Sequence, residues 1–566
     1  MKLVARIGEK TDWAIKSFNR AFPSVDDQKK IYEFKNLVLV TDQVMKVVNN
    51  DHKLLMLGLP VNFPDTRAAG STNAMLAALS ELDGAFAAFY VIPERNNVNV
   101  ITDFLGFYPL YCRRHQDKLD FSTHTRVFES DADLGSWGAF YSLGSTVGER
   151  TLLKGVMRVP AASILSYDLD NLSESRSSTW QWPAKVSKPD IYGIRSAWLK
   201  SCEGYAAHAD NSELLLSGGF DSRLIALSLE ELGLKVNALT IPHADEAGDL
   251  DGRIAGCLAN RLNLQHRRAR SSPDFFESSS YVDYLEAIEC SVPSLYLFIS
   301  QVCQFLEKDA FWDGLIPGIT LAAPGETGTG FEGYIRGLRC EKSSPFWRGV
   351  EEIFETDVTE AMWRESSALI REECEKYPDN THGVTEFRIR NKTRNRTSLS
   401  ALKALSSKSI PLIPGMSREY FDLTAAVPFQ FKEKYKLTLN ILKSISSSKV
   451  ELPVISGGKI VKSDGTVAFF LLCNLIKASA NFVSSHPSIS NYFPPSFKSI
   501  PFKSSNFLML DSLVEENDDI LDRVKIQSAG GFENLSMAAK RTLFHYRTWK
   551  WAHDGSLREK LSWSRP

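Results

Sequence analysis

The chain has 566 residues, a formal net charge of -2 and 43% apolar residues. A chain of this length is expected to hold two to four domains with sizeable cores. Because the net charge is close to zero, we expect neither nucleic acid nor an anionic membrane as a partner.

The spacing of the cysteines and the length of the apolar runs indicate the cellular compartment of the protein. The eight cysteines are scattered, and no two stand at Cys-x-x-Cys spacing. Reduced thiols in a cytoplasmic protein are the simplest interpretation. The first ten residues lack the apolar stretch of a signal peptide. The most apolar later run, Val467–Cys473, is too short to cross a bilayer and is expected to be a buried helix.

Residues 1–185 are expected to form one domain rich in β-structure. Strand-like runs separated by turn residues lie at 37–41, 53–57, 87–92 and 98–102. The second domain is expected over 186–566, after a linker that contains several prolines.

The second domain opens with alternating helix and strand patterns. A helix is expected from Ile191, followed by the apolar strand at 213–216, a Ser/Gly turn and a helix that ends at Gly233. A further strand at 236–241 and a helix at 249–262 follow. This alternation predicts a doubly wound parallel sheet with its ligand at the carboxyl ends of the strands.

The turn reads Ser217-Gly218-Gly219-Phe-Asp221-Ser222. Glycines let backbone N–H groups converge, and the following helix adds the positive end of its dipole, so the turn predicts an anion cradle suited to phosphate or pyrophosphate. Asp221 fits such a cradle if it holds a metal ion that the phosphates share. The absence of Gly-Lys-Ser/Thr excludes a Walker A loop. A plain tight turn is the alternative.

The turn resembles the pyrophosphate loop of the N-type ATP pyrophosphatases, which include asparagine synthetase. Four further segments, 82–86, 102–111, 121–125 and 151–160, resemble the N-terminal domain of asparagine synthetase in order and spacing. The resemblance implies an α/β protein: an N-terminal Ntn-type β-sandwich with αββα layers, then a doubly wound ATP-pyrophosphatase domain with a helical C-terminal part. It implies ATP and Mg²⁺ as cofactors. It also implies a set of nucleotide contacts: Leu216, Ser217, Gly218, Gly219, Asp221, Ser222, Thr240, Asp313 and Gly314.

The glutaminase activity of that family is not expected here. It needs a cysteine at the mature N-terminus, whereas Lys2 follows Met1 and the first cysteine is Cys112. The family's Asn-Gly-Glu substrate loop is replaced by Leu57-Gly58-Leu59. We therefore expect a structural or substrate-docking domain.

A second loop departs from the family at one position. Asp313-Gly314-Leu-Ile-Pro-Gly318 matches the family's Ser-Gly-Glu-Gly-Ser-Asp, so Gly318 stands where the resemblance places the second metal-binding aspartate. Either Asp313, Glu326 or Glu332 replaces that ligand, or metal binding is impaired. The glycine-rich run 324–330 is expected to be a lid or a plain surface loop.

Segment 452–465 resembles the family pattern that carries a catalytic lysine, and this lysine falls on Lys459, with Lys462 as the second choice. The resemblance implies that Lys459 and Arg223 stabilise developing negative charge and that Asp221 binds the metal. An ordinary solvated lysine is the alternative. His266 is expected to be a plain surface histidine, and the basic run 388–396 a solvated helix face or loop.

The implied reaction is adenylation of a substrate carboxylate, release of pyrophosphate and attack by an amine. Lasso-peptide macrolactam cyclases and β-lactam synthetases share this architecture with an inactive first domain. We therefore expect ring closure on a peptide or other small-molecule carboxylate, with a precursor peptide and a protease as possible partners. One alternative is ammonia-dependent, asparagine synthetase-like amidation of a small or polysaccharide-linked carboxylate. Another is a catalytically silent scaffold in a biosynthetic complex.

Overall fold

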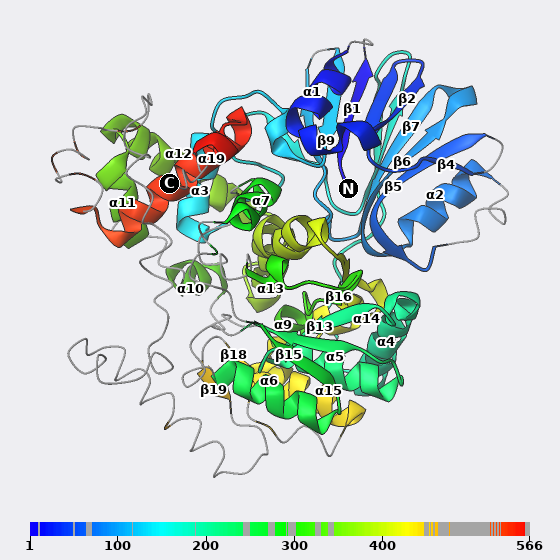
Figure 1. The fold of residues 1–566 in the computed structure, drawn as a ribbon, viewed down its shortest axis with the longest axis vertical. Helices are drawn as coiled ribbons and strands as arrows, with labels where there is room; N and C mark the ends of the chain where they lie inside the picture. The colour runs from blue at the N-terminus through cyan, green and yellow to red at the C-terminus, as the bar shows by residue number, and fades with distance from the viewer. Residues whose placement is uncertain are drawn as a thin grey trace.

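The fold was obtained as a computed structural model (Figure 1). It describes residues 1–8, 12–48, 51–63, 71–115, 117–186, 188–241, 250–269, 275, 278–289, 291, 301–322, 330–337, 345–446, 452, 454–456, 459–461, 475, 521, 525, 528, 531 and 534–560.

Two six-stranded antiparallel sheets make up the first part of the chain. The first has the order β10-β8-β9-β1-β3-β2 and the second the order β12-β11-β7-β6-β5-β4. The antiparallel β-structure expected for residues 1–185 is thus present. The strands of the first sheet are β1 (Leu3–Gly8), β2 (Lys30–Phe34), β3 (Leu37–Thr41), β8 (Tyr111–Arg114), β9 (Lys118–Ser122) and β10 (Val156–Arg158). Those of the second are β4 (Lys46–Val48), β5 (His52–Val61), β6 (Asp83–Ile92), β7 (Asn97–Thr102), β11 (Ser163–Asp168) and β12 (Glu174–Ser178).

The two sheets pack face to face with one helix on each outer face. Leu39 and Phe89 share the core between the sheets. Helix α1 (Trp13–Ala21) covers the first sheet through Phe18, and α2 (Thr72–Ser80) covers the second. Figure 1 shows these helices on opposite sides of the sheets. The layers α, β, β and α therefore succeed one another, because alternate residues of each strand bury apolar side chains on both faces.

Asp103 organises the turn that follows β7. Its carboxylate accepts hydrogen bonds from the backbone N–H groups of Leu105, Phe107 and Tyr108 at 2.9–3.1 Å, and from that of Phe86 at 3.3 Å. The side chain is completely buried. The Asp-x-x-Gly segment is thus a structural turn, held by one carboxylate that satisfies four backbone donors.

A five-stranded parallel sheet forms the centre of the second part (Figure 1). Its order is β15-β14-β13-β16-β17, and every neighbouring pair is parallel. The strand order reverses between β13 and β16, and in open α/β sheets the crevice at such a point is where ligands bind. The strands are β13 (Ser212–Leu215), β14 (Asn237–Thr240), β15 (Gln265–Arg268), β16 (Ala310–Trp312) and β17 (Ile410–Leu412).

Helices and one hairpin complete the described chain. Those that accompany the parallel sheet are α4 (Ile191–Gly204), α5 (Phe220–Glu231), α6 (Leu250–Arg261), α9 (Pro317–Thr320), α14 (Arg418–Ala425), α15 (Lys436–Ile445) and the strands β18 (Val454–Ser456) and β19 (Lys459–Val461). The others are α3 (Leu134–Leu143), α7 (Ser279–Ile288), α10 (Gly330–Gly337), α11 (Pro345–Ile353), α12 (Thr356–Cys374), α13 (Thr381–Phe387), α19 (Met537–Asp554) and α20 (Leu557–Lys560).

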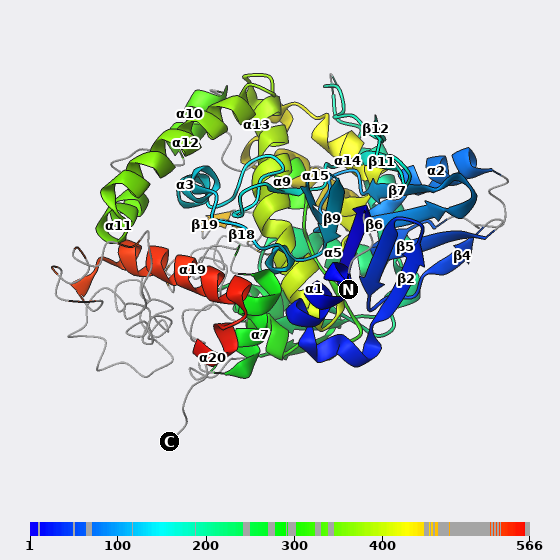
Figure 2. The same cartoon turned by 90° about the horizontal axis from the view of Figure 1, so that it is seen from above.

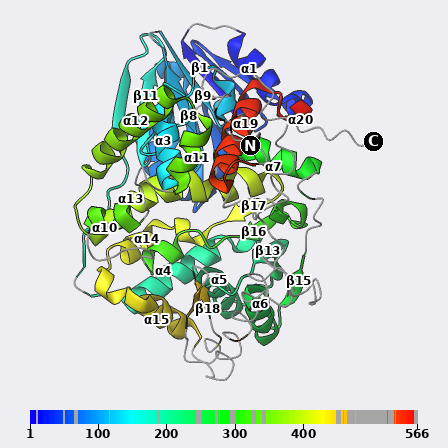
Figure 3. The ribbon, with the colours of Figure 1, turned by 90° about the vertical axis from the view of Figure 1, so that its left-hand side faces the viewer.

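Helix α3, from the first part, lies within an arc of later helices. Figures 2 and 3 show it beside α12, α11 and α19. Trp137 of α3 meets Trp549 of α19 edge to face, with ring centroids 5.1 Å apart. The two parts of the chain are thus joined by a shared apolar core.

The expectation that the basic run 388–396 is a solvated helix face or loop is wrong. It forms a π-helix over Arg388–Thr397 in which Arg394 and Arg396 are buried. Arg394 donates from Nε to the Gly106 carbonyl at 3.1 Å and from Nη2 to the Val159 carbonyl at 2.8 Å. The buried guanidinium of Arg394, with these two carbonyl acceptors, joins this helix to the first part of the chain.

Several predictions fall outside the described residues. These are the helix at Val467–Cys473, most of the glycine-rich run 324–330 with Glu326, and Lys462. Within the described part of the chain, no helix combines the length and the apolar character needed to cross a bilayer.

Candidate functional site

The Ser217–Ser222 loop connects β13 to α5 at the point where the strand order reverses. Ser222 Oγ receives a hydrogen bond from the Ser217 backbone N–H at 3.0 Å and lies 3.0 Å from Ser217 Oγ. Gly219 N–H donates to Ser217 Oγ at 3.2 Å. No side chain caps the N-terminus of α5. The expected strand, turn and helix are therefore present, and the loop is pinned by its own two serines.

Asp251 contacts this loop, and the sequence reasoning missed it. Its Oδ1 accepts a hydrogen bond from the Gly218 N–H at 3.1 Å. Asp251 lies in the first turn of α6, so the chain supplies its own anion to the glycine loop. A side chain at position 218 would stand 3.2 Å from this carboxylate, which explains the glycine. The acidic first turn of α6 was visible in the sequence, but its partner 33 residues away was not.

Asp221 and Asp313 lie together beside the loop. Burial, assisted by the negative charge of Asp313, raises the pKa of Asp221 to about 7. Burial raises the pKa of Asp313 to about 6, although the Leu315 N–H stabilises its ionised form from 2.9 Å. Two neighbouring carboxyl groups with raised pKa values form an environment that a divalent cation would stabilise.

Gly314 and Gly318 pack directly on Asp221. A Cβ atom at Gly314 would lie 2.6 Å from the Asp221 Cβ, and one at Gly318 would lie 2.6 Å from Asp221 Oδ2. Residue 318 is therefore adjacent to the carboxylate, and its missing side chain leaves that space to Asp221. Of the candidates for a replacement ligand, Asp313 lies beside Asp221, whereas Glu332 is exposed on α10.

These two carboxylates are suited to a partial metal shell. Among the described residues, no group of three or more His, Cys, Asp or Glu side chains is arranged to hold a metal ion. Mg²⁺ commonly takes only one or two protein carboxylates and completes its octahedron with water and phosphate oxygens. The residues present therefore fit a magnesium ion that arrives with a phosphate-bearing ligand.

Thr240 and His266 form a second contact at the end of β13. Thr240 Oγ1 donates to the Leu216 carbonyl at 2.7 Å and lies 2.8 Å from His266 Nε2. Because the hydroxyl proton goes to Leu216, Nε2 of His266 must carry the proton that completes this contact. His266 is half-buried on β15, and burial followed by the positive charge of Arg268 lowers its pKa.

The expectation that His266 is a plain surface residue is therefore wrong, because the parallel pairing of β14 with β15 brings it against Thr240. Thr240 is one of the expected nucleotide contacts. Its carbonyl accepts a hydrogen bond from the Ala269 N–H at 3.0 Å, so one lone pair of this oxygen is not available to a ligand.

Arg223 and Lys459 are placed on neighbouring elements. Arg223 is fully buried and donates from Nη1 to the Leu452 carbonyl at 2.7 Å. This bond ties the segment before the β18–β19 hairpin to α5, and β18 packs against α5 and α6. Lys459 begins β19 opposite Ser456, while its side chain lies outside the described part of the structure. Arg223 is thus placed to position the hairpin that carries Lys459.

The residues expected to correspond to the family's substrate loop, Leu57–Leu59, lie in strand β5 and contact a methionine. Gly58 N–H donates to Met1 Sδ at 3.0 Å. Burial raises the pKa of the Cys112 thiol to about 12, so this cysteine is not ionised at neutral pH. Neither group has the properties of a thiolate nucleophile.

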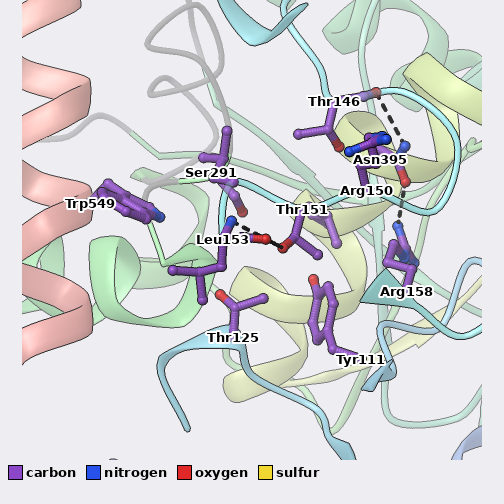
Figure 4. Close-up of a pocket in the computed structure, with 12 residues that line it drawn as sticks. Tyr111, Thr125, Thr146, Arg150, Thr151, Leu153, Arg158, Ser291, Asn395 and Trp549 are labelled. Atoms are coloured by element: carbon purple, nitrogen blue, oxygen red, sulfur yellow. Dashed lines mark hydrogen bonds between the residues drawn. The ribbon is translucent and has the colours of Figure 1, made fainter. Parts of the chain in front are cut away.

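A small pocket lies between the two parts of the chain (Figure 4). Its volume of about 30 Å³ admits about one water molecule, so it cannot hold a substrate. Arg158 Nη1 donates to Asn395 Oδ1 at 3.2 Å in its wall, and Asn395 Nδ2 donates to the Thr146 carbonyl at 3.2 Å. The pocket belongs to the packing between the parts.

No protein-family model and no curated protein matches the chain. Among solved structures, it is similar to the glutamine phosphoribosylpyrophosphate amidotransferase from B. subtilis, complexed with ADP and GMP. The two share 12% identity over 48% of this chain and 82% of that one, with a TM-score of 0.23. A structure described as the allosteric regulatory enzyme of purine biosynthesis gives 12% identity, 48% and 81% coverage and the same TM-score. A likeness at this TM-score is too coarse to assign a function.

Proposed function

We propose that the chain is an ATP-dependent ligase that joins a substrate carboxylate to an amine and releases AMP and pyrophosphate. The observation that carries the proposal is the uncapped N-terminus of α5, which follows a Ser/Gly loop and lies beside the paired carboxylates Asp221 and Asp313. Phosphate is the group that suits both a helix N-terminus and a shared magnesium ion.

The loop would hold the pyrophosphate portion of ATP. The backbone N–H group of Gly218 and the dipole of α5 would supply its positive potential, since the N–H groups of Ser217 and Gly219 donate to the serine hydroxyls of the loop. The Gly218 N–H now donates to Asp251. A phosphate oxygen would replace that carboxylate, so Asp251 has to move when nucleotide binds.

Asp221 and Asp313 would hold Mg²⁺. The ion supplies charge neutralisation to the triphosphate and to the leaving pyrophosphate. Since the pKa values of Asp221 and Asp313 are near 7 and 6 without metal, ionisation of the pair accompanies metal binding.

The proposed reaction has two steps. An oxygen of the substrate carboxylate attacks the α-phosphorus, the bond between that phosphorus and the bridging oxygen breaks, and pyrophosphate leaves with the electron pair. The amine nitrogen then attacks the acyl carbon, the bond to AMP breaks, and the amine loses a proton to solvent or to a nearby base. Lys459 is proposed to stabilise the charge that develops in these steps.

The source of the amine points to the substrate class. Neither the methionine thioether at Gly58 nor the Cys112 thiol, which burial keeps protonated, is suited to releasing ammonia from glutamine. We propose that the amine belongs to the substrate itself, so the product is a macrolactam on a peptide natural product. A precursor peptide and a partner protease would then act with the enzyme. The finer fold assignment, an Ntn-type sandwich followed by an ATP-pyrophosphatase domain, is part of this proposal.

A catalytically silent scaffold is the second candidate, and Gly318 favours it. This residue lies against Asp221 and provides no carboxylate. In a silent protein Asp251 would keep the Gly218 N–H permanently, and nucleotide would not displace it.

The test is production of pyrophosphate and AMP from Mg-ATP, with candidate precursor peptides bearing a free N-terminal amine and an acidic side chain. We expect product formation that depends on peptide and on Mg²⁺. A parallel reaction with aspartate and ammonium tests amidation by free ammonia. Absence of nucleotide binding in the presence of Mg²⁺ would favour the scaffold.

A further inference from the structure

A second, larger cavity lies where the first part of the chain meets α7, α19 and α20. Its volume is about 670 Å³, which is within the range of small-molecule sites. The floor is buried, since Phe22 and Trp551 are each 1% exposed, whereas Ser24 and Arg558 at the rim are open to solvent. None of the residues of the Ser217–Ser222 loop lines this cavity.

The acidic side chains of the cavity wall that face α20 and β3 are already engaged. Arg558 donates to Asp283 Oδ1 at 2.7 Å and to Glu286 Oε2 at 2.6 Å. Asp42 Oδ1 accepts from the Lys2 backbone N–H at 2.9 Å and from Gln43 Nε2 at 2.8 Å. These carboxylates have less capacity to attract a further cation.

Two basic side chains of the cavity wall, those of Lys2 and Arg126, form no ion pair with a described carboxylate. The Lys2 Nζ and the Arg126 Cζ lie 5.3 and 5.2 Å from the centroid of the same ring, that of Phe22. Within the described part of the chain, no carboxylate comes within 4.0 Å of either group. The Nε of Arg126 is buried and has no hydrogen-bond partner there.

The electrostatic environment of these two groups is unfavourable without a ligand. Burial lowers the pKa of Lys2, and the positive charge of Arg126 lowers it further, although the carboxylates of Asp42 and Glu286 oppose the change. Burial also lowers the pKa of Arg126, although the carboxylates of Glu289 and Glu286 oppose the change. A buried donor without an acceptor and two like charges on one ring are both relieved by an anion.

We propose that this cavity binds a small organic anion, whose carboxylate or phosphate head lies between Lys2 and Arg126. The head would accept the Nε–H of Arg126 and an ammonium proton of Lys2 in charge-assisted hydrogen bonds. The rest of the ligand would lie along Phe22 and Tyr108 and meet the hydroxyl groups of Thr123 and Ser406. The cavity is thus a ligand site separate from the proposed nucleotide loop.

The test is isothermal titration of the full chain, without nucleotide, at about 150 mM salt to screen non-specific attraction. Glutarate and ribose 5-phosphate are the probes, and the neutral analogues glutaramide and ribose are their controls. We expect saturable binding of at least one anionic probe and none of its neutral analogue. The stronger of the two probes identifies the head group.

Variants locate the site. Arg126→Met is expected to weaken binding about tenfold or more, and Lys2→Met about threefold or more, because each removes a charge-assisted hydrogen bond. Arg20→Met is the matched control, because Arg20 lines the same cavity but is paired with Glu129. The affinity of Arg20→Met for the anionic probe should stay within about twofold of that of the parent.

The proposal is overturned if neither anion binds up to about 10 mM, or if a neutral analogue binds as well as its anion. It is also overturned if Lys2→Met and Arg126→Met, each confirmed as folded by circular dichroism, bind like the parent. Binding of α,β-methylene-ATP is measured on the same variants. It should not change, so failure of this site and failure of the nucleotide site are distinguishable.

Discussion

Two aspartates of this protein, the buried Asp103 and the half-buried Asp221, occupy opposite kinds of site. Asp103, in the first part of the chain, accepts hydrogen bonds from four backbone N–H groups. Asp221, at the start of α5, receives no hydrogen bond from any described residue and lies beside a second carboxyl group. A buried carboxylate that is fully hydrogen-bonded stabilises a fold, whereas a half-buried carboxylate that has no donors and lies next to a like charge is a candidate for a functional site.

Replacing Asp103 should have the largest effect on stability. Asp103→Ala leaves four buried N–H groups without their acceptor, so we expect the free energy of unfolding to fall by about 4 kcal/mol. Urea unfolding followed by circular dichroism measures the loss. Asp221→Asn is the control, and it should unfold at the same urea concentration as the parent or a higher one. Equal losses of unfolding free energy in Asp103→Ala and Asp221→Asn would contradict the distinction between a structural and a functional aspartate.

Replacing Asp221 should have the opposite profile, with activity lost and the fold kept. Asp221→Asn removes the charge proposed to hold Mg²⁺, and we expect pyrophosphate release to fall about 100-fold, or about 2.7 kcal/mol of transition-state stabilisation. The matched control is Asp251→Asn, which is also at the loop but is not proposed to bind metal. Full activity of Asp221→Asn would show that Asp221 is not part of the active site.

The pH dependence of stability tests the environment of the Asp221 and Asp313 carboxyl groups. The pKa values of Asp221 and Asp313 are about 7 and 6 in the folded chain, against an ordinary value of 3.8. Between about pH 4 and pH 7 the folded chain therefore holds more protons than the unfolded chain, so this pair makes stability fall as pH rises.

The measurement is the unfolding temperature of the parent and of Asp221→Asn in EDTA, from about pH 5 to about pH 8. The unfolding temperature of Asp221→Asn should increase relative to that of the parent as pH rises, because the asparagine amide does not ionise. A constant difference across this range would show that Asp221 has an ordinary pKa.

Asp251 tests whether the glycine loop is an anion site at all. Asp251→Ala removes the carboxylate that accepts from Gly218 N–H. If phosphate competes for the same donor, α,β-methylene-ATP should bind about fivefold more tightly, or about 1 kcal/mol. Isothermal titration measures the change. Weaker binding in this variant would mean that Asp251 supports the nucleotide instead of competing with it.

Thr240 should give an effect of similar size, on stability instead of nucleotide binding. Thr240→Val removes the hydroxyl that joins the Leu216 carbonyl to His266, and we expect a stability loss of about 1 kcal/mol. Thr240→Ser keeps the hydroxyl and should recover most of that loss. If serine and valine behave alike, the methyl packing and not the hydrogen bond accounts for the effect.

The sequence predicted the parts of the site that depend on local patterns. The strand, turn and helix around Ser217 follow from an apolar run, two glycines and helical spacing, and the structure contains them. Partners distant in the chain were not predictable in this way. Asp251 meets Gly218, and His266 meets Thr240, because parallel strand pairing and helix packing bring them together.

The buried π-helix shows the same limit. Charge and polarity suggest solvent for the run 388–396. The burial of Arg394 is favourable because its guanidinium donates to the carbonyls of Gly106 and Val159 and to the Glu149 carboxylate.

The most direct test of the central proposal is isothermal titration of α,β-methylene-ATP into the full chain, with Mg²⁺ and with EDTA. The proposal predicts binding that Mg²⁺ strengthens and that Asp221→Asn reduces to the affinity seen in EDTA. Absence of binding in either buffer, or binding that neither Mg²⁺ nor Asp221→Asn changes, would contradict it.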